Sequence, residues 1–177
     1  MTKNKESMIN LLEPFNYIKT MIFDIDGVFT DSRLTVFEDG SMIRVMNVRD
    51  GFAVKEALRA GIQIIVITGG SSLGVVKRLK GLGIKEIHWG IQDKMATYKE
   101  IIAKHGLDEA FILYMGDDLP DFQVMRRVGL PVCPADAATE IIKIAQYISP
   151  LAGGAGCVRD VIEKTLRVQG TWPIYED

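Results

Sequence analysis

Two carboxylates stand directly after an apolar run near the start of the chain. Met21, Ile22 and Phe23 precede Asp24, and Asp26 follows one residue later, with no basic side chain between the two acids. A carboxylate beside a hydrophobic strand is costly, because burial penalises its charged form. A pair of carboxylates in this place therefore indicates a chemical role.

Other polar residues are expected at the same edge of a sheet, because ligands bind at the carboxyl ends of parallel strands. Each of these residues alone has an ordinary explanation, such as a helix cap or a turn. Together, four carboxylates in a partly dry crevice would repel one another. A hard divalent cation removes that conflict, and oxygen ligands at this density favour Mg²⁺. The set comprises Asp24 and Asp26 after the first strand, Thr68, Gly69 and Gly70 after the second, Lys94 after the third, and Asp117 and Asp118 after the fourth, with Asp121 close behind.

The two carboxylates of the first strand suit phosphoryl transfer. An ionised, metal-bound Asp24 can attack phosphorus and form an aspartyl-phosphate intermediate. Asp26 lies two residues further on, where it can protonate a poor leaving group and then take a proton from the attacking water. The sequence therefore predicts a nucleophile and a general acid/base.

The remaining members of the set suit a phosphate. Thr68 and the backbone amides of Gly69 and Gly70 lie at an expected helix N-terminus, which favours a phosphoryl oxygen. Lys94 supplies a positive charge that stabilises the transition state and holds Asp24 in place. We therefore expect catalytic roles for Thr68 and Lys94.

The elements that position these residues follow from the pattern of apolar segments. Strand-like runs, several of them apolar throughout, alternate with helix-like segments. The expected strands are residues 20–25, 63–68, 86–89, 111–115 and 130–133, with a short candidate at 146–148. The expected helices are residues 52–60, 72–82, 94–105, 121–128, 137–145 and 158–168. This alternation predicts an α/β fold with a doubly wound, Rossmann-like parallel sheet.

Residues 30–47 break this alternation. Their β-prone runs flank Asp39 and Gly40, and Asp-Gly in that position is a strong hairpin signal. We expect a β-hairpin inserted after the first strand, beside the acidic pair. No repeat or linker marks a second domain, so residues 1–177 are expected to form one domain. The first 15 residues and the tail after Gln169 are expected at its periphery.

Four segments occur in the order of the four motifs of the haloacid dehalogenase superfamily, over nearly the whole chain. They are DIDGVFTD, VITGG, the lysine after IQD, and GDDLPD. The chain therefore resembles that superfamily. The resemblance implies that Mg²⁺ is bound by Asp24, by the backbone carbonyl of Asp26 and by Asp117, with Asp118 acting nearby or through water.

Within the superfamily, the hairpin insertion and the segments MNVRDG (46–51) and AGGAGCVRD (152–160) resemble the 3-deoxy-D-manno-octulosonate 8-phosphate phosphatases. The resemblance implies the small-cap (C0) group, a homotetramer with the hairpins as a stalk, and a role in lipopolysaccharide synthesis. It implies Arg49 as a ligand of the substrate carboxylate, an ion pair with Asp50 or a neighbour being the alternative. Arg159 is a candidate of the same kind.

Three alternatives stay open. The family has arginine where this chain has Gly70 and Ala155, so the same chemistry could act on a nine-carbon keto-acid 9-phosphate or another sugar phosphate. A receiver-type phospho-acceptor uses similar residues, but it carries its adjacent acidic pair on the first strand, whereas here that pair comes late. A catalytically weak scaffold subunit is the third, and turnover of an aryl phosphate would exclude it.

The composition sets the remaining expectations. A net charge of −2 argues against a nucleic-acid partner. No apolar run approaches the roughly 20 residues that span a bilayer, and the first 15 residues lack a signal-peptide pattern. Cys133 and Cys157 lack metal-ligand spacing, which favours free thiols in a reducing compartment. We expect a cytoplasmic protein, whose aromatic tail at 172–175 is either disordered or docked on a neighbouring subunit.

Overall fold

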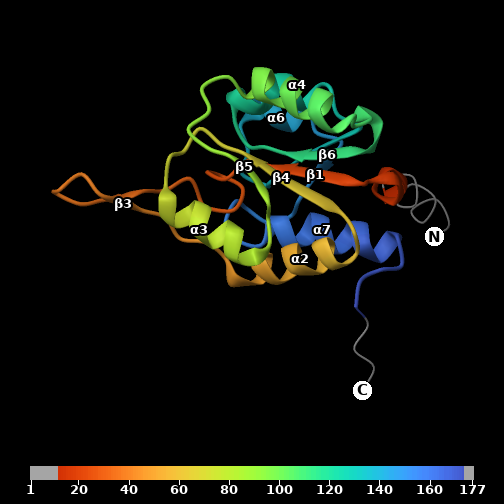
Figure 1. Cartoon of the computed structure of the whole chain (residues 1–177), viewed down its shortest axis with the longest axis horizontal. Helices are drawn as coiled ribbons and strands as arrows, with labels where there is room; N and C mark the ends of the chain where they lie inside the picture. Colours follow the sequence, from red (N-terminus) through yellow and green to blue (C-terminus); the bar gives the residue numbers. More distant parts are fainter. Residues whose placement is uncertain (1–11, 174–177) are drawn as a thin grey trace.

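A sheet of six parallel strands forms the centre of the protein, seen here in a computed structural model that describes residues 12–173 (Figure 1). The strand order is β5-β4-β1-β6-β7-β8. The strands are β1 (Thr20–Phe23), β4 (Gln63–Ile67), β5 (Glu86–His88), β6 (Ile112–Met115), β7 (Leu130–Cys133) and β8 (Tyr147–Ile148). All the expected strands occur at or close to their expected bounds, and the predicted doubly wound α/β fold is confirmed.

Helices cover both faces of the sheet (Figure 1). One layer consists of α2 (Val48–Arg59), α3 (Leu73–Leu82) and α7 (Cys157–Val168), and the other of α4 (Lys94–His105), α5 (Phe122–Met125) and α6 (Thr139–Ile144). Every residue of β1 is buried because its side chains alternate between these layers: Phe23 packs with the first and Ile22 with the second. This is the reason the strand is apolar throughout. None of the helices within residues 12–173 has the length and apolar character needed to cross a membrane.

Two helices differ from expectation at their first turns. The helix expected at 52–60 begins earlier, at Val48, because the Asn47 side chain accepts a hydrogen bond from the backbone N–H of Arg49 at 2.9 Å and so caps it. The helix expected at 121–128 is shorter, since α5 ends at Met125, and a 3₁₀ turn, η3 (Leu119–Asp121), precedes it. Pro120 lies in that turn, where proline is tolerated because its missing N–H has no partner there.

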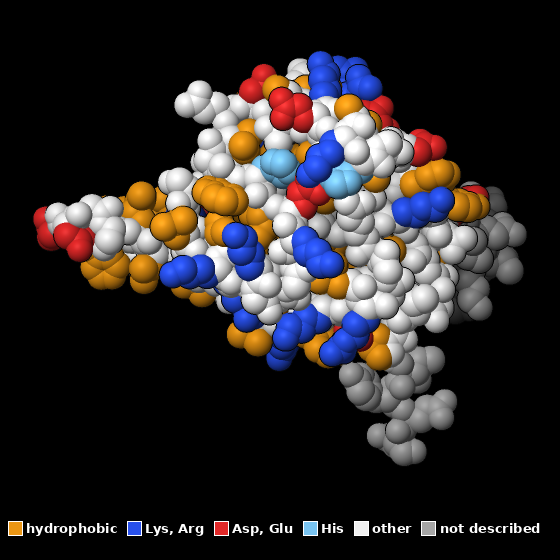
Figure 2. Space-filling view, in the orientation of Figure 1, with side chains coloured by type: hydrophobic (Ala, Val, Ile, Leu, Met, Phe, Trp, Pro, Cys, Tyr) orange, Lys and Arg blue, Asp and Glu red, His pale blue; other side chains and the backbone are white. Residues whose placement is uncertain are grey.

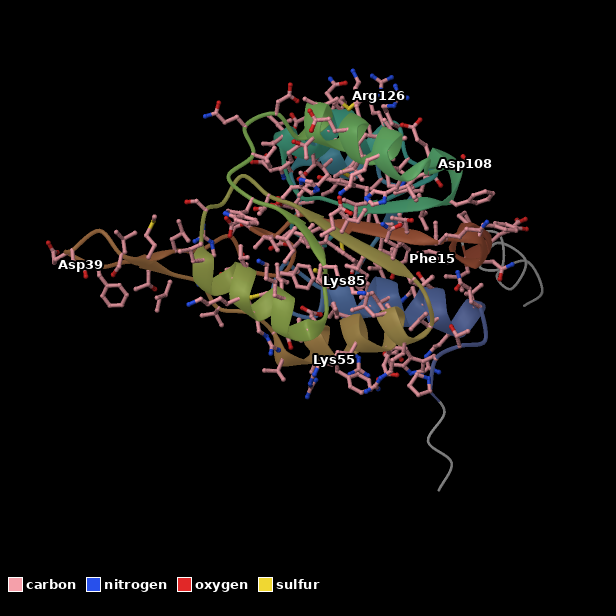
Figure 3. The ribbon with its side chains drawn as sticks, viewed as in Figure 1. Phe15, Asp39, Lys55, Lys85, Asp108 and Arg126 are labelled. Atoms are coloured by element: carbon pink, nitrogen blue, oxygen red, sulfur yellow. The ribbon has the colours of Figure 1, made fainter. Side chains whose placement is uncertain are left out.

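The predicted hairpin is present and projects away from the sheet, with Asp39 near its outer end (Figures 1 and 3). Its strands are β2 (Thr35–Val36) and β3 (Met42–Ile43), which pair antiparallel, and Gly40 turns the chain with a φ of +81°. Hydrophobic side chains line the projection (Figure 2). The exposed ones are Leu34, Val36, Phe37, Met42, Ile43 and Val45. A two-stranded ribbon of this length is not stable by itself.

Both ends of the described chain contribute to the core, so the prediction that they are peripheral was wrong at two aromatic residues. Phe15, in the 3₁₀ helix η1 (Glu13–Tyr17), is fully buried with its ring centroid 5.3 Å from that of Tyr147. Trp172 is 9% exposed and packs on Phe52 of its own chain. A single aromatic residue buries a large area, but a single residue forms no periodic sequence pattern from which its burial could be predicted. The expectations for residues 1–11 and 174–177 lie outside the described residues.

Replacing Phe15 with Ala should lower the free energy of unfolding by about 3–5 kcal/mol, because it leaves a cavity in the core. Tyr17 provides a matched control in the same 3₁₀ helix, since its side chain is 52% exposed. Tyr17→Ala should change the free energy by no more than about 0.5 kcal/mol. Urea unfolding of both variants measures the difference, and equal effects would show that Phe15 is not a core residue.

Candidate active site

The carboxyl ends of β1, β4 and β6 open into one pocket of about 360 Å³. These strands are neighbours in the sheet, so residues that follow them in the chain are brought together. All the predicted site residues except Arg49 and Arg159 line this pocket. They are Asp24, Asp26, Thr68, Gly69, Gly70, Lys94, Asp117 and Asp118.

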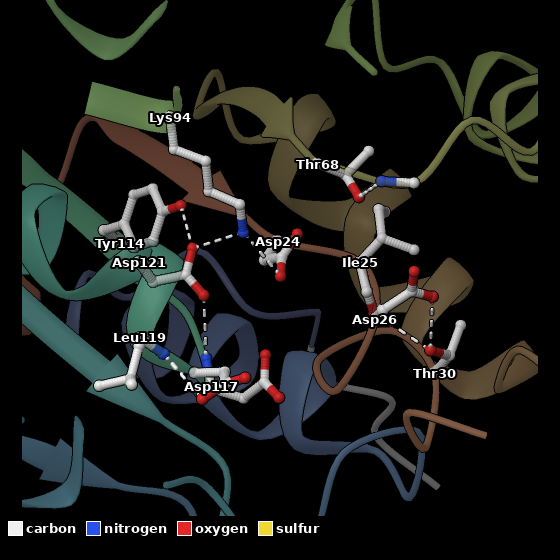
Figure 4. A network of polar contacts seen from close by, with 12 residues as sticks. Asp24, Ile25, Asp26, Thr30, Thr68, Lys94, Tyr114, Asp117, Leu119 and Asp121 are labelled. Carbon is white, nitrogen blue, oxygen red and sulfur yellow. Dashed lines mark hydrogen bonds and ion pairs between the residues drawn. The ribbon is translucent and has the colours of Figure 1, made fainter. Parts of the chain in front are cut away.

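Lys94 lies at the centre of a buried charge network (Figure 4). Its ammonium is 2.8 Å from Asp24 Oδ2 and 2.7 Å from Asp121 Oδ1, and its side chain is 7% exposed. Burial alone would lower the pKa of Lys94, but the attraction of Asp24 and Asp121 outweighs it and raises that pKa. Lys94 therefore keeps its charge and joins two carboxylates.

Asp121 is one of the site residues to which the sequence analysis gave no role. It is 1% exposed and accepts a second hydrogen bond at Oδ1, from the Tyr114 hydroxyl at 2.6 Å. Asp118 is exposed instead, and its side chain accepts from the backbone N–H of Leu119 at the start of η3. The available signal for Asp121 was its position four residues after Asp117, in the same polar segment behind β6. Nothing in the sequence pointed to Tyr114.

Three carboxylates could hold a metal ion: Asp24, Asp117 and Asp121 each offer an oxygen within 4.8 Å of the others. Asp117 Oδ1 is buried and has no hydrogen-bond partner among the described residues. Gly27 has a φ of +89°, and a Cβ there would lie 1.9 Å from Asp117 Oδ2, so only glycine leaves room for this carboxylate. An unpartnered buried oxygen among hard donors fits Mg²⁺.

Crowding changes the proton affinity of this group. Burial, followed by repulsion from Asp121, raises the pKa of Asp24 to about 7, although Lys94 opposes the shift. Burial and the charges of Asp24 and Asp121 raise the pKa of Asp117 to about 8. Without a cation, protons are therefore retained near neutral pH, and a bound cation would replace them.

Asp26 faces a different environment, at the rim of the same pocket. Arg44 Nε donates a hydrogen bond to Asp26 Oδ1 at 2.6 Å, and Arg44 Nη2 donates one to Asp26 Oδ2 at 3.0 Å. The Thr30 hydroxyl also donates to Asp26 Oδ1, at 3.3 Å. Asp26 is not a member of the three-carboxylate group. Arg44 comes from the hairpin, and the sequence analysis assigned it no role.

The loop after β4 presents the Thr68 hydroxyl to the pocket. Thr68 is 4% exposed, and its backbone N–H donates to the carbonyl of His88 at 2.9 Å, which continues the sheet. Its Oγ1 accepts from the backbone N–H of Gly70 at 3.1 Å (Figure 4). The helix expected from residue 72 begins one residue later, with Ser72 as its cap. The pocket thus holds a hydroxyl and an ammonium facing a cluster of carboxylates.

The two predicted substrate arginines lie away from this pocket. Arg49 is exposed in the first turn of α2. Asp50, its alternative partner, is fully buried and accepts from the backbone N–H of Arg159 at 2.8 Å. The Arg159 guanidinium lies 5.5 Å from the Trp172 ring centroid and pairs with Glu163 at 3.1 Å. Within its own chain, Arg159 is held by these two contacts.

The glycine-rich segment at 152–156 supports the loop that follows Asp26. Gly154 donates its backbone N–H to the carbonyl of Val28 at 3.0 Å. A Cβ on Gly153 would lie 2.1 Å from the carbonyl oxygen of Gly27. These glycines therefore bring two stretches of backbone into contact, and they fix the loop whose Gly27 admits Asp117.

Comparisons with known proteins agree with this arrangement, although a scan against models of protein families found no match. A 3-deoxy-D-manno-octulosonate 8-phosphate phosphatase from Escherichia coli (strain K12) is 36% identical over 153 residues, which are 86% of this chain and 81% of the relative. The structure of a HAD superfamily (subfamily III A) hydrolase from Legionella pneumophila has a TM-score of 0.91 at 32% identity, covering 96% of this chain and 93% of that one.

A third relative is the 3-deoxy-D-manno-octulosonate 8-phosphate phosphatase of Moraxella catarrhalis, solved in complex with a magnesium ion, a phosphate ion and a KDO molecule. It has a TM-score of 0.88 at 31% identity, covering 92% of this chain and 94% of that one. The presence of magnesium in this relative agrees with the three-carboxylate group described above. The expected cofactor, Mg²⁺, is supported by both observations.

Fold and site together define a phosphoric monoester hydrolase of the haloacid dehalogenase superfamily. Within it, the chain belongs to the family of 3-deoxy-D-manno-octulosonate 8-phosphate phosphatases. The resemblance inferred from the motifs and the expected enzyme class are both confirmed.

The raised pKa values of Asp24 and Asp117 predict that Mg²⁺ binding depends on pH. Below about 7 and about 8 these carboxyl groups hold protons that the ion must displace. Each displaced proton weakens the apparent affinity about tenfold per pH unit. Affinity measured by isothermal titration calorimetry should therefore be lower at pH 6 than at pH 8, and equal values would contradict the assignment.

The same shifts predict the stability of the metal-free protein. A carboxyl group with a raised pKa stabilises the folded state fully below its ordinary pKa of 3.8, and that contribution decreases as the pH rises from there until it is lost above about 7 for Asp24 and about 8 for Asp117. The Tm of the metal-free protein should fall over this window, and Mg²⁺ should restore it. Asp117→Asn should flatten the fall, and differential scanning calorimetry measures both.

Proposed function

We propose that this enzyme hydrolyses 3-deoxy-D-manno-octulosonate 8-phosphate to the free sugar acid and phosphate, through an aspartyl-phosphate on Asp24. The observation that carries the proposal is the contact of Asp24 with Lys94, 2.8 Å apart in a pocket otherwise rich in carboxylates. The names of the relatives support the substrate.

Asp24 is the proposed nucleophile. Lys94 binds its Oδ2, which leaves the other oxygen to attack phosphorus as the bond to the sugar oxygen breaks. Asp26 gives a proton to the departing sugar oxygen and later takes one from the water that hydrolyses the aspartyl-phosphate. The two carboxylates line one pocket but have different partners, which suits two different tasks.

The other residues of the pocket stabilise the phosphoryl group. Thr68 and the backbone amides of Gly69 and Gly70 donate hydrogen bonds to its oxygens, and Lys94 balances their charge. Asp24 and Asp117 would hold the cation, with Asp121 beside them and Asp118 at the rim. The Mg²⁺ held there would supply positive charge to neutralise and orient the phosphate.

Recognition of the sugar acid is proposed to involve a second copy of the chain. The exposed apolar side chains of the hairpin favour burial between subunits, so we propose a homotetramer in which a neighbour completes each pocket. Arg49 is exposed next to the hairpin, where it could bind a substrate carboxylate across such an interface. Arg159 is the weaker candidate because of its packing.

We further propose that the chain acts as one domain in the cytoplasm, in lipopolysaccharide synthesis.

A nine-carbon keto-acid 9-phosphate is the second candidate substrate. Gly70 lines the pocket where the family has arginine, and this favours it, since a contact to the eight-carbon sugar acid is then missing. Membership of a phosphatase family argues against the receiver-type and scaffold alternatives.

A substrate panel tests the proposal by phosphate release. It contains 3-deoxy-D-manno-octulosonate 8-phosphate, a nine-carbon keto-acid 9-phosphate and a neutral hexose 6-phosphate, with Asp24→Asn as the inactive control. The first compound should have the highest kcat/KM. Arg49→Ala should raise its KM more than it lowers kcat, because remote binding is removed. The substrate assignment would be wrong if the neutral sugar phosphate had a kcat/KM about tenfold higher than the first compound and Arg49→Ala changed neither KM nor kcat.

Asp26→Asn tests the acid/base role through the leaving group. Turnover of an alkyl phosphate should fall about 10²–10⁴-fold, the range for lost acid–base catalysis. The loss should be smaller for an aryl phosphate, whose leaving group needs little protonation. Asp39→Asn at the hairpin tip is the control and should leave both rates unchanged. Equal losses on the two substrates would argue that Asp26 is not the acid.

A further inference from the structure

The hairpin sends one charged side chain, that of Arg44, back to Asp26 at the rim of the active-site pocket. The Arg44 side chain is only 9% exposed, whereas its neighbours Ile43 and Val45 are 51% and 74% exposed. A guanidinium is rarely buried without a partner of opposite charge, because the loss of hydration must be compensated. Here the partner is Asp26.

The contact between these two residues is a two-pronged one. Arg44 Nε and Nη2 bind the two oxygens of Asp26 separately, at 2.6 and 3.0 Å. Such a fork fixes the plane of the carboxylate as well as its position, which a lysine cannot do. Arg44 therefore contacts the proposed acid/base, Asp26, and can affect the reaction through this carboxylate.

Gly70 makes room for the pair. A Cβ at this position would lie 3.0 Å from Asp26 Oδ2 and 3.3 Å from Arg44 Nη2, closer than most side-chain contacts. A larger residue at position 70 would push against the fork. The glycine and the arginine thus form one arrangement around Asp26.

We propose that Arg44 is a positioning residue for the acid–base step, acting through Asp26; the proposal rests on the function given above. When Asp26 passes its proton to the departing sugar oxygen, the carboxylate that remains gains negative charge. The guanidinium binds that charged form best, so it stabilises the transition state more than the starting state. When water later returns a proton to Asp26, the fork loosens again. The hairpin thereby supports a chemical step inside its own subunit.

A double-mutant cycle of Arg44→Met and Asp26→Asn isolates this role. Glycerol phosphate and p-nitrophenyl phosphate are the substrates, since neither carries a carboxylate that Arg44 could bind. Arg44→Met should lower kcat for glycerol phosphate by about 10–100-fold, less than the full acid–base contribution because Asp26 is still present, and for p-nitrophenyl phosphate by less than about threefold. In the Asp26→Asn background it should have no further effect, because the two residues act as a unit.

Two further variants separate chemistry from folding. Arg33→Met is the matched control, because Arg33 also lies in the hairpin insertion but is 87% exposed and pairs with Asp31. It should leave both rates unchanged. Arg44→Lys keeps the charge and loses the fork, so its loss on glycerol phosphate should be intermediate. If Arg44→Met does not fold by circular dichroism, the cycle is run with Arg44→Lys.

The kinetic results distinguish the positioning role of Arg44 from the proposed phosphatase function. Equal losses on both substrates, or losses that multiply in the double variant, would overturn the positioning role while leaving the phosphatase function intact. A wild-type enzyme that turns over no phosphate ester would overturn the function and the positioning role together. A loss of turnover that is confined to glycerol phosphate, and that is absent from the Asp26→Asn background, would establish the positioning role of Arg44.

Discussion

The site depends on an excess of buried negative charge. Lys94 is shared by Asp24 and Asp121, and one ammonium cannot balance two carboxylates and a third, Asp117, close by. Because these groups are buried, the imbalance raises the pKa of Asp24 and Asp117, and it favours a bound cation and then an anionic substrate oxygen. Metal affinity, protonation and phosphate binding are therefore consequences of one electrostatic constraint.

The fold meets this constraint by bringing backbone close to carboxylates. Gly27 leaves room for Asp117, and at Gly116 a Cβ would lie 2.4 Å from the Asp121 carboxyl carbon. Gly153 then packs against Gly27, so a segment more than a hundred residues away supports the loop after Asp26. These contacts explain why the site tolerates such crowding: the rigid sheet and the glycine contacts hold the charged groups where they would otherwise spread apart.

The hairpin has two surfaces with different physical properties. Outward it presents apolar side chains, including Phe37 and Val45, that cost free energy in water and favour contact with another protein surface. Inward it places Arg44 on Asp26. Since the same short ribbon has both surfaces, burial of the outer one would also hold the inner one steady. In this way assembly and chemistry would be linked by a few residues rather than by a separate cap domain.

The sequence by itself determined the strands, the hairpin and the meeting of Asp24, Thr68 and Lys94 in one pocket. Those features depend on local patterns: continuous apolar runs, an Asp-Gly turn, and polar residues at strand ends that a parallel sheet must gather. Only the tertiary structure decided that Asp121 rather than Asp118 joins the buried cluster, that Arg44 binds Asp26, and that Arg159 packs on Trp172. The physical reason is that each of these depends on the direction of a side chain in the folded chain. Strand and turn patterns predict where the backbone goes, and they leave open which of two adjacent carboxylates turns inward.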